Sequence, residues 1–120
     1  MPGTTLLSTS VAANVAVDES AQIEARLTSR AAPDVRIDGE VLDLRQEGFD
    51  VEMLQPLCAS ELFDVTFRRG DEQSTRLRVR VVESNWLAVR GRKVFYHTRF
   101  QFVHADAPAT RAVIDKLTGE

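Results

Sequence analysis

A strict alternation of basic and apolar residues over residues 76–81, Arg-Leu-Arg-Val-Arg-Val, constrains the fold more than any other feature of this sequence. Successive side chains of a β-strand point to opposite faces, so the pattern predicts a strand with Leu77, Val79 and Val81 facing a core. Six residues of strict alternation do not fit the 3.6-residue period of a helix. We therefore expect a sheet with one buried and one exposed face.

The same two-residue period recurs along the chain and predicts five further strands. They are expected at residues 21–28, 35–44, 49–53, 61–68 and 94–103. The strand that begins at residue 77 is expected to bend at residues 84–86, where the phase of the alternation shifts. Gly39 inside the second strand predicts a bulge or a strong bend, as small barrels need at their corners.

A change of period after the last strand predicts one C-terminal helix. Asp106 is expected to cap it, Pro108 to lie in its first turn, and Gly119 to end it. Its apolar stripe consists of Val113, Ile114 and Leu117. Six short strands and one helix favour a mainly β fold, a closed or nearly closed six-stranded antiparallel barrel over residues 21–120.

Residues 1–20 carry little pattern and are rich in Ser, Thr, Ala and Val. We expect them to form a flexible or extended leader, in which residues 14–17 could add a short strand. No apolar run approaches the ~20 residues that span a bilayer. The first residues also lack the basic start and long apolar core of a signal peptide. The sequence therefore predicts no membrane insertion.

The composition fits one domain with a packed core, because 43% of the 120 residues are hydrophobic and 28% are charged. The formal net charge of -3 disfavours a general nucleic-acid binder. The single cysteine, Cys58, excludes a disulfide or a thiolate metal cluster within the chain. This usage suits a reducing cytoplasm, where we expect the protein to reside.

The sequence contains no set of residues whose spacing predicts a catalytic triad or a metal site. His97 and His104 are the only histidines, and their odd spacing on or after one strand predicts opposite faces of the sheet. Cys58 lies between Leu57 and Ala59 and is expected to be a buried apolar filler. No nucleophile, base and acid can be assembled from these residues, so no enzyme and no metal site are predicted.

Basic residues concentrate in the second half of the chain. Residues 1–66 hold 12 acidic and 4 basic residues, whereas residues 67–120 hold 6 acidic and 11 basic residues. Arg76, Arg78 and Arg80 are expected to form a basic row on one face of a strand. One interpretation is a solvated outer face that pairs with Asp50, Glu52 and Glu24. The other is a surface for an anion or a nucleic acid.

Two alternating runs are joined by a short turn, Asp43-Leu44-Arg45-Gln46-Glu47-Gly48. Asp43 can cap such a turn through its own backbone, and Gly48 provides the backbone freedom that a tight turn requires. Both residues thus support a hairpin whether or not the turn binds a ligand.

The order of parts resembles the PilZ domain, a bacterial receptor family for cyclic di-GMP with a six-stranded barrel and a C-terminal helix. Its signatures are an Arg-x-x-x-Arg segment before the barrel and an Asp/Asn-x-Ser-x-x-Gly turn after the second strand. The turn here matches at Asp43 and Gly48, and the resemblance covers roughly residues 20–118. It implies ligand-binding residues Arg26, Arg30, Asp43, Arg45 and Gly48, with cyclic di-GMP as the ligand.

The sequence departs from this pattern at both signatures. Arg45 stands in the place of the serine, and Arg26 and Arg30 fall on and after the first strand instead of before it. Each lost charge-assisted contact costs on the order of 1.5–3 kcal/mol. The resemblance therefore implies a bacterial signalling adaptor that binds cyclic di-GMP weakly or not at all and acts through a protein partner.

Two alternatives remain open. The first is a genuine cyclic di-GMP receptor that uses Arg26, Arg30 and the 43–48 turn. The second is a barrel that binds nucleic acid through Arg76, Arg78 and Arg80. The sequence does not specify an oligomeric state, and no cofactor other than the dinucleotide is implied.

Overall fold

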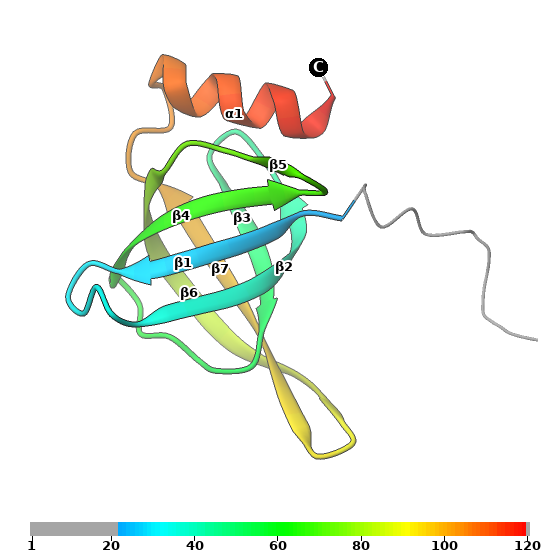
Figure 1. The fold of residues 1–120 in the computed structure, drawn as a ribbon. Helices are drawn as coiled ribbons and strands as arrows, with labels where there is room; N and C mark the ends of the chain where they lie inside the picture. The colour runs from blue at the N-terminus through cyan, green and yellow to red at the C-terminus, as the bar shows by residue number, and fades with distance from the viewer. Residues whose placement is uncertain (1–21, 120) are drawn as a thin grey trace, which may run out of the picture.

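The computed structural model describes residues 22–119, which form a closed β-barrel with one helix across its end (Figure 1). The elements are β1 (Glu24–Ser29), β2 (Arg36–Leu44), β3 (Gly48–Met53), β4 (Leu62–Arg69), β5 (Glu72–Gln73), β6 (Leu77–Arg90), β7 (Lys93–Phe102) and α1 (Pro108–Thr118). The expected leader at residues 1–20, with its strand at 14–17, lies outside the described residues.

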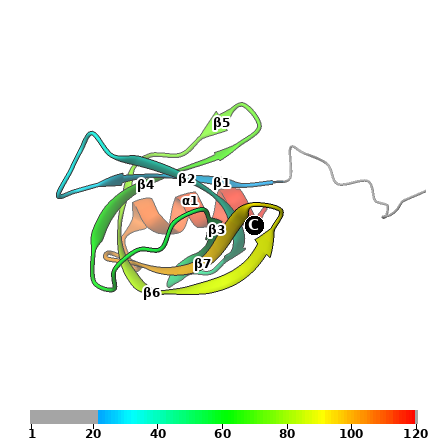
Figure 2. The ribbon, with the colours of Figure 1, turned by 90° about the horizontal axis from the view of Figure 1, so that it is seen from below.

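Six antiparallel strands follow each other around the barrel in the order β1-β2-β3-β7-β6-β4, and pairing of β1 with β4 closes the ring. The predicted six-stranded antiparallel barrel with a C-terminal helix is thus confirmed. The two-residue strand β5 was not predicted; it pairs with the end of β4 at Arg68 and Arg69. Figure 2, a view along the barrel, shows α1 lying across the far end of the ring.

The barrel interior is filled by the apolar residues that the alternation predicts. Leu77, Val79 and Val81 are buried, as expected from the pattern that begins at Arg76. Phe49 stacks on Phe100 at a ring-centroid distance of 4.9 Å and meets the ring of Phe67 edge-on at the same distance. This aromatic cluster places β3 firmly against β7, which fixes the outward side chains of both strands.

The helix begins and ends where its sequence allows, although its N-terminal cap differs from the prediction. Pro108 is in the first turn and Gly119 ends the helix with a left-handed backbone, as expected. The capping position, however, is Ala107, which provides no side-chain hydrogen bond, so the prediction of Asp106 as the cap was wrong. Asp106 instead approaches Arg111, at 3.8 Å.

Two other local predictions also require correction. The irregularity in β2 lies between Val41 and Asp43, whereas Gly39 stays in regular pairing with Ala25. A Cβ atom on Gly39 would overlap the Val51 side chain, so close packing and not a bulge explains this glycine. Cys58 is exposed in the connection between β3 and β4, so it is not the buried filler that the sequence suggested.

Candidate functional site

A cluster of charged residues surrounds Asp50 on the outer face of the barrel. Asp50 lies in β3 between Asp43 of β2 and Arg99 of β7, because the strand register pairs it with both. Its neighbours on β3, Phe49 and Val51, point into the core, so the alternation of the strand directs Asp50 outward. The carboxylate is nevertheless only 8% exposed, because surrounding side chains cover it.

Three cationic or hydrogen-bonding groups converge on this carboxylate. Arg45 donates from Nη2 to Oδ1 at 3.0 Å, and Arg99 donates from Nε to the same oxygen at 3.3 Å. The Nε2 atom of His97 lies 2.9 Å from Oδ2. A carboxylate this well covered requires such partners, since burying it unpaired would cost several kcal/mol.

Arg45 is held from a second side by the turn itself. Its Nη1 atom donates to the Asp43 carboxylate, so one guanidinium bridges the first residue of the turn and Asp50. A longer contact of 3.8 Å reaches Glu47. The expected backbone cap by Asp43 is therefore replaced by an ion pair with Arg45.

The protonation equilibria of the cluster favour the ion pairs. Burial raises the pKa of Asp50, but hydrogen bonds from Arg45, His97 and Arg99 outweigh burial and hold that pKa below its usual range. The hydrogen bond to Asp50 raises the pKa of Arg45. Asp50 and Arg45 are therefore oppositely charged at neutral pH.

The backbone of the turn is packed tightly against β7. The Arg45 N–H donates to the Gly48 carbonyl at 2.8 Å, and the Phe102 N–H donates to the Glu47 carbonyl at 2.9 Å. A Cβ atom on Gly48 would overlap the carbonyl oxygen of Phe100. The need for glycine at position 48 thus comes from close contact with β7, and not from the turn conformation that the sequence suggested.

Arg26 and Arg30 do not join Asp43, Arg45 and Gly48. Arg26 donates to Asp38 at 3.2 Å, five residues before Asp43 on β2, which corresponds to about 16 Å along a strand. Arg30 donates to both carboxylate oxygens of Asp64 on β4, at 3.2 and 3.3 Å. Both guanidinium groups therefore serve surface ion pairs away from the turn.

A shallow concavity of about 570 Å³ lies beside the turn, between the start of β1 and the end of α1. It is lined by Gln22, Ile23, Glu40, Val41, Leu42, Asp43, Leu44, Leu117 and Thr118. The lining contains two carboxylates but no lysine or arginine. This hollow is therefore poorly suited to an anionic ligand.

The row Arg76, Arg78 and Arg80 is exposed on the barrel surface, as the alternation predicts. In the strand register Arg78 lies opposite Asp64, and Arg80 lies opposite Gln101. Among residues 22–119, no ion pair joins this row to Asp50, Glu52 or Glu24, so the expected cross-pairing was wrong in its partners. Glu52 pairs instead with Arg90, at 3.0 Å.

His97 and Arg99 are the site residues that sequence reasoning missed. Both alternate with the buried Thr98 and Phe100, so the period of β7 places them on the outer face. Their contacts with Asp50 depend on the pairing of β7 with β3, which the sequence does not specify. In the described part of the chain, the side-chain hydrogen-bond partner of His97 is Asp50, and no hydroxyl or thiol group completes a catalytic triad with them.

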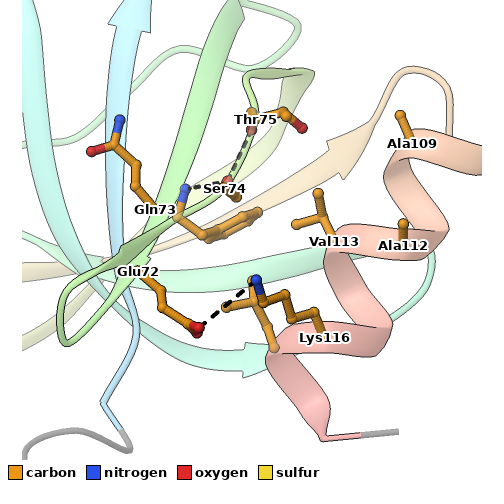
Figure 3. A pocket seen from close by; sticks show the side chains of 10 residues that line it. Glu72, Gln73, Ser74, Thr75, Ala109, Ala112, Val113 and Lys116 are labelled. Atoms are coloured by element: carbon orange, nitrogen blue, oxygen red, sulfur yellow. Dashed lines mark hydrogen bonds and ion pairs between the residues drawn. The ribbon is translucent and has the colours of Figure 1, made fainter.

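A separate groove of about 310 Å³ runs between α1 and the β4–β5 hairpin (Figure 3). Its lining is mostly apolar and includes Phe67, Ala109, Ala112, Val113 and Leu117. An ion pair between Lys116 and Glu72, at 3.8 Å, spans one side of the groove. The volume is at the lower end of the range for small-molecule sites.

No helix within residues 22–119 is long and apolar enough to cross a membrane. The same part of the chain contains no group of three or more histidine, cysteine, aspartate or glutamate residues arranged to hold a metal ion.

Comparison with known proteins relates the fold, and not the sequence, to an established family. No protein-family model and no curated protein sequence matches the chain. A solved structure that does match is the PilZ domain with cyclic di-GMP of YcgR from Escherichia coli. The TM-score is 0.63 over 82% of each chain, at 11% sequence identity. The barrel order, the terminal helix and this similarity lead to one conclusion: the chain has a PilZ-like fold.

Proposed function

We propose that this chain is a PilZ-like signalling adaptor that binds cyclic di-GMP weakly or not at all and acts through protein contacts. The observation that supports this proposal most is the position of Arg45. It occupies the serine place of the family's turn, and its guanidinium is shared between Asp43 and the buried Asp50.

A phosphate could recruit Arg45 only by displacing these carboxylates. Removing the guanidinium would leave Asp50, which is 8% exposed, with fewer charge-assisted hydrogen bonds. Leaving a buried charge without such a partner costs roughly 3–5 kcal/mol. That cost would offset about half of the free energy of binding of a micromolar ligand, which is about 8 kcal/mol.

The surroundings of the turn disfavour the dinucleotide for a second reason. Glu40 and Asp43 line the concavity beside it, and Gln22 and Ile23, just before β1, contribute no positive charge. Residues 1–22 also contain no arginine or lysine. A ligand with two phosphates would therefore meet negative potential on this side of the barrel.

Isothermal titration calorimetry of the full chain with cyclic di-GMP tests the proposal. We expect no saturable heat at ligand concentrations up to about 1 mM, the range where binding free energies fall to about 4 kcal/mol. Saturable binding that disappears in Asp43→Ala and Arg30→Ala would overturn it in favour of the receptor alternative. Asp71→Ala, in the β4–β5 turn, is the matched control.

The protein-contact half of the proposal rests on the apolar groove beside α1. Ala109 and Ala112 are exposed small residues in its wall, so an apolar side chain of a partner could enter there. A bacterial cytoplasmic location fits the single free Cys58, because thiols stay reduced there.

An affinity experiment with bacterial extract tests the role of the groove. A protein partner should be retained by the parent chain and should not be retained by the Ala112→Glu variant. Equal retention by Asp115→Ala and Ala112→Glu would contradict this role of the groove.

A further inference from the structure

The β6–β7 hairpin extends beyond the barrel as a two-stranded arm, at the end opposite α1 (Figure 1). Pairing of β6 with β4 stops at Arg80, and pairing of β7 with β3 begins only at Tyr96. Backbone bonds from the preceding connection cover β6 at Val81, and Leu57 N–H donates to the Ser84 hydroxyl at 3.2 Å. Among the described residues, residues 85–90 of β6 have a strand neighbour on one side only.

One face of this arm is apolar and open to solvent. Trp86 lies opposite Tyr96, and Val89 lies opposite Val94, so all four side chains share the face that continues the barrel interior. The irregularity between Trp86 and Ala88 adds the residue that brings Trp86 and Val89 onto the same side. Trp86 is 65% exposed and Val89 is 56% exposed.

An exposed apolar strand edge is a surface that proteins cover or protect, because its free backbone groups recruit another strand. The arm contains no acidic residue between Asn85 and Tyr96. Arg90 is held by Glu52 and by the ring of Phe95, 4.6 Å away. In the described part of the chain, Arg92 and Lys93 at the tip form no ion pair. The edge is therefore apolar along its length and basic at its end.

We propose that a second copy of this chain covers the edge by antiparallel pairing of β6 with β6, around a twofold axis between Leu87 and Ala88. This register places Trp86 of each copy opposite Val89 of the other, on the same face of a continuous four-stranded sheet. Closed twofold pairing satisfies the free β6 edges of both copies at once. Trp86 and Val89 of the two copies then form one contiguous apolar patch in which they shield one another from water, flanked by Tyr96 and Val94.

The charges of the arm fit the same register. Arg92, in the hairpin turn of one copy, comes level with Glu83 of the other just beyond the paired residues 85–90, and Glu83 is exposed on the outer face beside Arg99. A lipid surface fits less well, because end-on insertion would carry Arg90, Arg92 and Lys93 deepest, where charge is most costly. The contact is confined to a short edge, so we expect a weak dimer, as is typical of interfaces below about 1,200 Å².

Sedimentation of the full chain over a range of concentrations tests this dimer, and Trp86 reports on it directly because it is the single tryptophan. We expect a concentration-dependent dimer whose formation shifts the Trp86 emission to shorter wavelength. Val89→Asp should abolish both effects. Val35→Asp, at another exposed apolar position just before β2, should leave both unchanged.

Charge exchange tests the register. Glu83→Arg and Arg92→Glu should each weaken the dimer, and the double variant should restore it, with circular dichroism showing that each variant remains folded. A monomer at all concentrations with constant Trp86 emission would overturn the proposal, as would a dimer insensitive to Val89→Asp. A blue shift of Trp86 that requires phosphatidylglycerol vesicles, while the protein remains monomeric, would overturn it in favour of a lipid surface. None of these outcomes depends on whether cyclic di-GMP binds.

Discussion

Asp50 shows how one buried carboxylate organises the outer face of the barrel. It receives hydrogen bonds from Arg45 and Arg99 and contacts His97, and it is covered because β2, β3 and β7 meet around it. A side chain in this position stabilises the fold only while its partners remain. The chemistry of the turn at residues 43–48 is therefore tied to the stability of the barrel.

Substitution of Asp50 should destabilise the protein and change its response to acid. The pKa of Asp50 lies below its unfolded value of about 3.9. The contribution of the carboxylate to the free energy of unfolding is therefore fully present above that pH, and it is lost as the pH falls through the folded pKa. Asp50→Asn should lower the free energy of unfolding at pH 7 by about 1–3 kcal/mol. Urea unfolding between about pH 2 and 7 should show a smaller acid loss in the variant than in the parent. An equal loss of stability at acid pH in the variant and the parent would contradict this role. Asp38→Asn, which changes an exposed ion pair, is the control.

Gly48 should not tolerate a side chain. Gly48→Ala would place a methyl group against the Phe100 carbonyl, so β3 and β7 would have to separate locally. We expect a loss of about 1–3 kcal/mol, as for other overpacked sites. Thermal unfolding measures it, and the exposed Glu47→Ala in the same turn should have almost no effect. Unchanged stability of Gly48→Ala would show that the contact with β7 is not required.

The strands and the helix illustrate which elements can be predicted from local pattern. Alternation at residues 76–81 predicts β6 because one face is buried and the other is solvated, and the period change at Pro108 predicts α1. The two-residue β5 has no periodicity to detect. The reason for Gly39 could not be predicted either, because Val51 approaches it from a neighbouring strand.

Besides the burial of Ile114 and Leu117 in the core, one arginine of β4 links the C-terminal end of α1 to the barrel. Arg69 donates from Nη1 to the Leu117 carbonyl at 2.7 Å and from Nη2 to the Lys116 carbonyl at 3.4 Å, so it satisfies carbonyls at the helix C-terminus. Arg69→Ala should cost about 1–2 kcal/mol and increase hydrogen exchange in α1 more than in β3. Arg68→Ala, on the exposed neighbouring position, should leave α1 protected. Equal exchange in the two variants would contradict the capping role.

At the scale of the whole molecule, the basic row on β6 faces solvent on a chain of net charge -3. This balance gives little long-range attraction for a polyanion. We expect no retention on DNA or RNA at about 50 mM salt, where phosphate contacts are strongest. Retention that weakens with salt and disappears when Arg76, Arg78 and Arg80 are changed to glutamate would instead support the nucleic-acid alternative.

The fold could be predicted from sequence much further than the site. Alternation and turn residues reflect local structure, so the barrel strands and the helix could be predicted from the sequence pattern. The Asp50 cluster depends on which strands become neighbours, and the positions of Arg26 and Arg30 depend on the register of β1 with β2 and β4. The role of Asp43, Arg45 and Gly48 toward cyclic di-GMP stays a prediction.

The state of the Arg45 side chain in solution tests the central claim most directly. Nuclear magnetic resonance of its guanidinium protons should show slow exchange, because Asp43 and Asp50 hold the group. We predict that these signals and the amide signals of residues 43–48 stay unchanged when excess cyclic di-GMP is added. Saturable shifts of the Arg45 signals with the dinucleotide would contradict the account and show that the turn binds it.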